Sequence, residues 1–62
     1  MYEKLRTKRK EKRVPVKVLC EILSLETEPA YFKKETGTVK VTVDEAISLA
    51  RFFKTSVEKL FG

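Results

Sequence analysis

The chain has 62 residues, of which 42% are hydrophobic; this is enough for one small domain, residues 1–62, but not for a catalytic domain beside a regulatory one. One cysteine and no histidine exclude an internal disulfide and most metal-dependent or hydrolytic chemistry, and no apolar run is long enough for a membrane span or a signal peptide. The net charge of +5 favours a polyanion as the partner.

The first predicted helix, residues 2–13, lies in the segment that carries the positive charge. Residues 1–17 contain eight basic and two acidic side chains, whereas the remaining 45 residues contain six basic and seven acidic ones. The absence of glycine and proline favours a helix, but Tyr2 and Leu5 are its only apolar residues. The charge fits either a surface that binds nucleic acid or an ordinary solvated helix face.

A second helix is predicted at about residues 15–23, because proline fits the first turn of a helix but not its interior. Its apolar face contains Cys20, which we interpret as a small buried side chain, since no second cysteine or histidine is present. Three further apolar residues form a possible dimer or partner surface: Val18, Ile22 and Phe52. Alternatively, Tyr2 or Phe61 covers Val18 and Ile22, the two that lie on this helix.

A four-residue turn, residues 24–27, leads into a third helix at about residues 28–36. Thr27 is expected to cap the N-terminus of this helix. Gly37 is expected to end it, because glycine readily takes the left-handed conformation that often follows a helix. The next four residues alternate polar and β-branched side chains and could form a strand, but between helices an extended loop is favoured.

A capping box, Thr42-Val43-Asp44-Glu45, predicts the start of a fourth helix that ends at about Phe53. Helical spacing places its buried face at Val43, Ala46, Ile47, Ala50 and Phe53. Thr55 or Ser56 is expected to cap a short fifth helix through Leu60. The predicted class is therefore all-α, a compact five-helix domain with a central helix-turn-helix.

The pattern of apolar residues, caps and turns resembles a known family. The segments that carry the resemblance are Leu19-Cys20 to Leu23, Tyr31 to Glu35 with Gly37, the capped fourth helix, and Ser56 to Phe61. Over Leu5 to Phe61 the chain resembles the lambda-repressor/Cro-type helix-turn-helix family. The resemblance implies a lambda-repressor-like DNA-binding domain of a bacterial or phage cytoplasm, with the third helix in the major groove.

The resemblance also implies roles for individual residues. The positions that match base-contacting ones are Thr27, Glu28, Pro29, Phe32 and Lys33. Those that match, or would take over, phosphate contacts are Arg9, Lys17, Thr38 and Lys40. Glu35 matches an acid that commonly pairs with a basic residue of the first helix, here Arg9, and as a surface pair it would contribute about 1 kcal/mol or less.

Several of these residues also have ordinary structural explanations. Lys33 could reach guanine O6 and N7, contact a phosphate or remain solvated, and Glu28 could accept from cytosine N4 or only favour the helix dipole. Pro29 and Phe32 could touch a thymine methyl group, and Phe32 could instead contact a protein partner or belong to the core.

Four positions depart from the family pattern. Ser24 and Lys54 stand where the family prefers glycine, and Val16 stands where a polar residue usually bonds a phosphate. Lys34 stands at a typical apolar core position, so either the third helix is rotated or this lysine extends to the surface.

The leading functional hypothesis is a sequence-specific regulator that binds double-stranded DNA as a homodimer, a repressor of phage or mobile-element type. The alternative is an adaptor with the same fold that binds a protein. A third hypothesis is non-specific binding of RNA or a membrane surface through residues 4–17. No nucleophile, base and orienting group can be assembled, so we expect no enzyme activity and no metal, cofactor or small-molecule substrate.

Overall fold

The computed structural model describes the whole chain, residues 1–62, and contains five helices and no strand. In chain order the helices are α1 (Glu3–Glu11), α2 (Val16–Ile22), α3 (Glu28–Thr36), α4 (Val43–Phe52) and α5 (Val57–Phe61). The predicted all-α class is confirmed, and each helix lies within about two residues of its predicted bounds. The segment before α4 is an extended loop rather than a strand.

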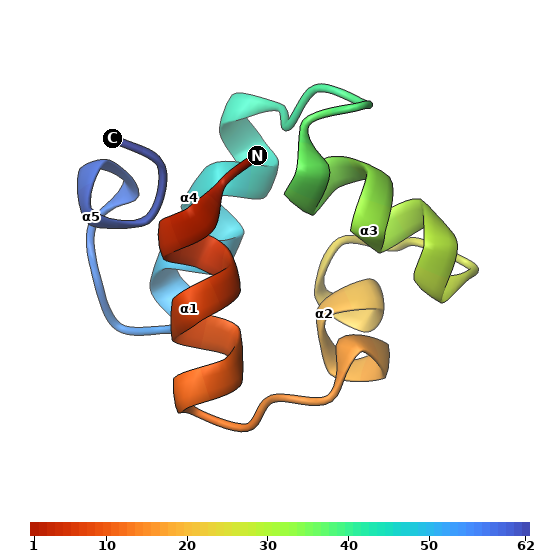
Figure 1. Ribbon diagram of the computed structural model, residues 1–62, viewed down its shortest axis with the longest axis horizontal. Helices are drawn as coiled ribbons and strands as arrows, with labels where there is room; N and C mark the ends of the chain where they lie inside the picture. The colour runs from red at the N-terminus through yellow and green to blue at the C-terminus, as the bar shows by residue number, and fades with distance from the viewer.

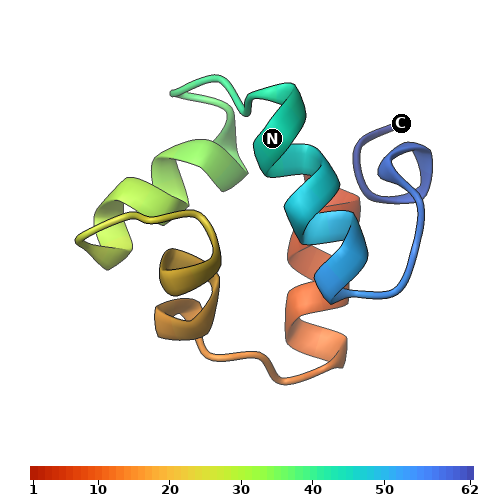
Figure 2. The same ribbon diagram turned by 180° about the vertical axis from the view of Figure 1, so that it is seen from behind.

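The helices form two groups around one core. Figures 1 and 2 show α1, α4 and α5 on one side of the molecule and α2 with α3 on the other. Contacts of α1 with α3 and of α2 with α4 join the two groups. All five helices and the turns after α2 and α4 supply buried side chains to this core: Leu5, Leu19, Cys20, Leu23, Tyr31, Leu49, Ala50, Phe53 and Leu60.

The buried face of α4 is rotated from the predicted one. Ala46, Ala50 and Phe53 are buried as expected, but Leu49 is also in the core and Val43 is 76% exposed. The buried stripe therefore starts at Ala46 and continues at i+3, i+4 and i+7, which places Ile47 at its exposed edge. The prediction for Val43 and Ile47 was wrong because the apolar pattern alone could not tell which of two overlapping stripes meets the core.

Three helices end in a left-handed residue that is not glycine. Arg13, Ser24 and Lys54 have φ values of 53°, 56° and 55°, whereas Gly37 after α3 has 85°. After each of the three, the next residue donates its amide hydrogen to a carbonyl five residues earlier, which closes the helix end. Side chains with a Cβ are strained in this conformation by about 1–2 kcal/mol, so Arg13, Ser24 and Lys54 close these helix ends at an energetic cost.

The amino-terminal residues are fixed against α3 and α5. The Tyr2 amide donates a hydrogen bond to the Glu35 carbonyl at 2.9 Å, and the Tyr2 ring meets the Phe61 ring edge-on at a centroid distance of 4.9 Å. A Cβ added at Gly37 would lie 3.7 Å from the Met1 nitrogen. Tyr2 and Phe61 therefore pack on each other, and Ile22 is half-buried through its contact with the core.

Candidate nucleic-acid interface

Helix α3 has one face in the core and the opposite face in solvent. The Thr27 hydroxyl accepts a hydrogen bond from the Ala30 amide at 3.3 Å, which caps the helix as predicted. Tyr31 and Glu35, one turn apart, are the two fully buried residues of the helix. The outward face is formed by residues that are all exposed: Glu28, Pro29, Phe32, Lys33 and Thr36.

The Glu35 carboxylate lies at the centre of a buried network. Its side chain is 0% exposed and accepts four hydrogen bonds. Arg9 donates from Nε at 2.9 Å and from NH2 at 3.1 Å, and Arg6 donates from Nε at 3.0 Å. The Tyr31 hydroxyl donates the fourth bond at 2.7 Å. The carboxylate therefore ties α1 to α3 through Arg6 and Arg9, and Tyr31 holds it from within α3.

The structure brings Arg9 and Glu35 together, but their expected description as a surface pair was wrong. Burial alone would raise the pKa of the Glu35 carboxyl; the hydrogen bonds from Arg9, Tyr31 and Arg6 outweigh it and hold this pKa below its usual value. The bond to Glu35 raises the pKa of Arg9, and burial together with Glu35 raises that of Tyr31. The carboxylate is thus held in its charged form inside the fold.

Arg9 links this network to the outward face of α3. Its guanidinium carbon lies 5.5 Å from the centroid of the Phe32 ring, within the range of a cation–π contact. The Phe32 ring also meets the Tyr31 ring edge-on at 5.7 Å. Phe32 is therefore held at the surface between a basic and an aromatic side chain. Arg9, with a side chain 12% exposed, is fixed in one position at the edge of the same face.

Lys34 is half-buried and faces the amino-terminal end of α4. Its Nζ lies 2.9 Å from Glu45 Oε1 and donates to the Lys40 carbonyl at 3.2 Å. Glu45 Oε1 also accepts from the Thr42 amide at 2.9 Å, and the Thr42 hydroxyl accepts from the Glu45 amide at 3.1 Å, so the predicted capping box is present. Burial opposes the charge on Glu45, but these hydrogen bonds lower its pKa. The Lys34 side chain thus fixes the loop between α3 and α4 through an ion pair and a hydrogen bond.

The other residues predicted to contact phosphate are exposed. Lys40 and Thr38 lie in the loop after α3, and the Thr38 hydroxyl shares a hydrogen bond with the Thr36 hydroxyl at 3.1 Å. Lys17 is exposed in the first turn of α2. These side chains and Arg9 come from three separate elements.

The possible dimer or partner surface does not form a single exposed patch. Val18 and Ile22 on α2 are half-buried, whereas Phe52 on α4 is 40% exposed and meets the Phe53 ring edge-on at 5.0 Å. Ile22 packs against the core, so of these three residues only Phe52 is exposed.

Cys20 is a buried free thiol that stabilises the turn before α3. It donates a weak hydrogen bond to the Thr27 carbonyl at 3.4 Å, and burial raises its pKa, which keeps it protonated and unreactive. No group of three or more potential metal ligands occurs in the structure. None of the helices combines the length and apolar character needed to cross a membrane.

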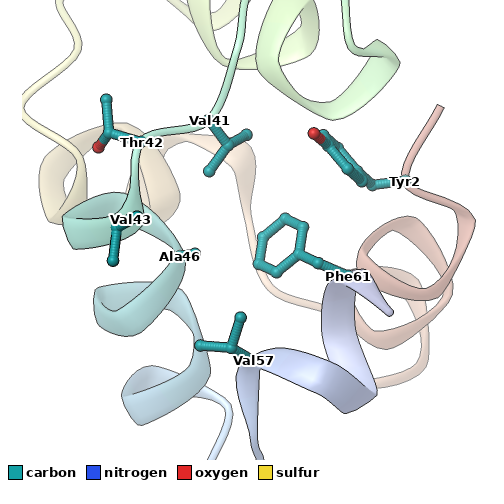
Figure 3. A pocket seen from close by; sticks show the side chains of 7 residues that line it. All are labelled: Tyr2, Val41, Thr42, Val43, Ala46, Val57 and Phe61. Carbon is teal, nitrogen blue, oxygen red and sulfur yellow. The ribbon is translucent and has the colours of Figure 1, made fainter.

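An apolar cavity of about 180 Å³ lies beside the carboxyl end of the α3–α4 loop. Figure 3 shows the Tyr2 and Phe61 rings on one side of it and Val43 with Ala46 on the other. It has no charged side chain and therefore lacks the groups that contact phosphates.

Sequence reasoning missed two sets of contacts in the site. Arg6 and Tyr31 also donate hydrogen bonds to Glu35, and Glu45 forms an ion pair with Lys34. The spacing of Arg6 from Arg9 and of Tyr31 from Glu35 places each pair on one helix face, which is the signal that could have predicted a shared network.

In comparisons with known proteins, no family model matches the chain, and no curated protein sequence or solved structure is significantly similar to it.

Proposed function

We propose that this protein is a sequence-specific DNA-binding repressor of the lambda-repressor/Cro-type helix-turn-helix kind, with α3 in the major groove. The outward face of α3 is the observation that carries the proposal. Glu28 and Lys33 on this face are exposed and form no ion pair within the chain, so their polar groups are free to meet base edges. The opposite face is anchored by Tyr31 and Glu35, which gives the helix a fixed orientation.

Base recognition would come from three side chains that lie within about one and a half helical turns of α3. Lys33 suits the acceptors O6 and N7 of guanine, and Glu28 suits the amino group of cytosine. Phe32 suits a thymine methyl group, and its contact with Arg9 keeps its ring in place before DNA arrives.

Phosphate contacts would position the helix on either side of the groove. Lys17 lies at the start of α2, and Lys40 lies in the loop after α3. Arg9 is already held by Glu35 and uses its Nε and NH2 for that pair, so NH1 remains for a phosphate oxygen. A preorganised guanidinium loses little conformational entropy on binding, which favours this role.

A repressor of this size would bind as two copies. The Cα atoms extend over 25 × 23 × 18 Å. Half-sites one helical turn apart are separated by about 34 Å along the duplex, which exceeds the longest Cα extent, so each copy would occupy its own half-site. Occupation of a promoter or operator by such a dimer would repress transcription by exclusion.

The first experiment is affinity selection from a random pool of DNA duplexes at about 100 mM salt, where phosphate contacts still contribute. We expect a single palindromic motif with half-sites about 10 base pairs apart. Failure to enrich any motif with the folded protein would refute sequence-specific binding.

Variants then separate the proposed roles. Lys33→Ala is expected to relax the preference at one base position by about 1–3 kcal/mol. Lys40→Ala is expected to weaken binding to all DNA sequences equally and to reduce the number of counterions released on binding by about one. Lys59→Ala, an exposed residue of α5, is the matched control and is expected to change neither property.

A protein-binding adaptor is the second candidate. Glu26 and Glu28 are exposed at the start of α3, beside the exposed ring of Phe32, and carboxylates repel phosphates. If no duplex binds even at low salt while the protein remains folded, this surface is better explained by a protein partner.

A further inference from the structure

We propose that a basic groove formed by the C-terminal ends of α1 and α4 binds an acidic protein segment that carries an apolar side chain. Figure 2 shows these two helix ends on the part of the molecule that lies away from α3. The groove is a cavity of about 480 Å³ whose walls include Lys8, Lys12, Val14, Phe52, Phe53 and Lys54. The proposal does not depend on DNA binding, because none of these residues belongs to the α3 surface.

The charge of the groove is uncompensated. Its lining contains three lysines and no acidic residue. Lys8 lies 3.6 Å from Glu11 in a solvent-exposed pair, which contributes little, and neither Lys12 nor Lys54 has an ion-pair partner. Three neighbouring ammonium groups around one hollow attract carboxylates from a partner.

Lys54 occupies a backbone position that disfavours it. Its φ of 55° lies in the left-handed region, where a glycine would relieve the strain. The Lys54 side chain forms no hydrogen bond or ion pair with the rest of the chain, so it does not repay that strain within the fold. The Lys54 ammonium group is therefore free to pair with a carboxylate of a partner.

The apolar part of the groove favours a peptide over a nucleic acid. Phe52 is a large exposed side chain beside the lysines, and it rests edge-on against the buried Phe53. The backbone of a duplex brings phosphates but no apolar group, so Phe52 would stay exposed to water. An acidic segment with an apolar side chain pairs with the lysines and covers Phe52 at the same time.

The test is fluorescence anisotropy with the full chain and a labelled acidic peptide that has one central phenylalanine. Replacing that phenylalanine by serine is expected to weaken binding by about tenfold, since burial of an aromatic side chain is lost. Replacing the peptide's acids by their amides is expected to abolish binding. Equal affinity of the three peptides would overturn the proposal.

Protein variants locate the site. Phe52→Ser is expected to lower the affinity for the peptide by about tenfold, and Lys54→Gly is expected to lower it by roughly two- to fivefold. Lys54→Gly also removes backbone strain and is expected to raise the melting temperature, so its loss of binding cannot come from unfolding. Lys10→Ala, an exposed lysine of α1 outside the groove lining, is the control and should bind as the parent does.

Two outcomes would reject the assignment. One is unchanged peptide affinity in both Phe52→Ser and Lys54→Gly. The other is displacement of the peptide by an oligonucleotide whose own binding falls in the same two variants, which would make the groove a nucleic-acid site.

Discussion

Replacing Glu35 by Gln is expected to lower the free energy of unfolding by about 2–3 kcal/mol. The Glu35 side chain is 0% exposed and accepts bonds from Arg6, Arg9 and Tyr31. The amide keeps the size of the side chain but loses its charge and directs a donor at neighbouring N–H groups.

The magnitude follows from how much of the network stays buried. Breaking a fully buried pair costs about 3–5 kcal/mol, because the remaining charge is left without a partner. The Arg6 side chain is 38% exposed and can be solvated after the change, whereas Arg9 at 12% is largely enclosed. We therefore expect a value below that range. Small domains are stable by about 0.05–0.15 kcal/mol per residue, so the change removes a large part of the total.

The assay is urea and thermal unfolding at pH 7, followed by circular dichroism. In a domain of this size each kcal/mol corresponds to about 4–8 °C in melting temperature. Glu21→Gln, an exposed glutamate of α2 without an ion pair, is the matched control and should change stability by less than about 0.5 kcal/mol. A double-mutant cycle with Arg9→Met measures the coupling directly. The reasoning would be refuted if Glu35→Gln changed the free energy of unfolding by less than about 0.5 kcal/mol, or if the two substitutions had additive effects in the cycle.

Three further predictions concern pH and the helix ends. The folded-state pKa values of Glu35 and Glu45 are lowered, so their contribution is complete above the ordinary glutamate pKa of about 4.3 and is lost as pH falls below it. Acid unfolding of Glu35→Gln should accordingly have a shallower pH dependence than the parent; identical slopes would contradict this. Ser24→Gly should stabilise by about 1 kcal/mol in urea unfolding because it relieves a φ of 56°, whereas Ser48→Gly inside α4 should destabilise. Thr42→Ala removes the α4 cap and should lower the free energy of unfolding by about 1 kcal/mol; no change would mean that the cap is redundant.

The helix limits were predictable because they depend on neighbouring residues. Thr27, Gly37 and Thr42 act locally through their side chains or backbone freedom, and the structure places each in its expected role. The burial of α4 was less predictable, since it depends on which neighbours the helix meets. Its apolar residues Val43 and Leu49 have similar character in the sequence but opposite exposure in the fold.

The candidate site was predictable in its pairs but not in its environment. Opposite charges and the family resemblance indicated Arg9 with Glu35, yet the depth at which Glu35 is buried depends on tertiary packing. The ion pair of Lys34 with Glu45 was not predicted, because Glu45 lies on the next helix and already takes part in the capping box of that helix. The dual use of one carboxylate is not visible in a spacing pattern.

The bond between the Tyr2 amide and the Glu35 carbonyl determines where a fused tag would emerge. The amino terminus lies beside Gly37, at the end of α3, so an affinity tag or fluorophore placed there would compete for the surface proposed to meet DNA. Figure 1 shows the carboxyl terminus next to α5, farther from α3 than the amino terminus is, although Phe61 packs on Tyr2. Proteins labelled at the carboxyl end are therefore the appropriate reagents for measuring DNA affinity, and amino-terminal fusions are expected to bind more weakly.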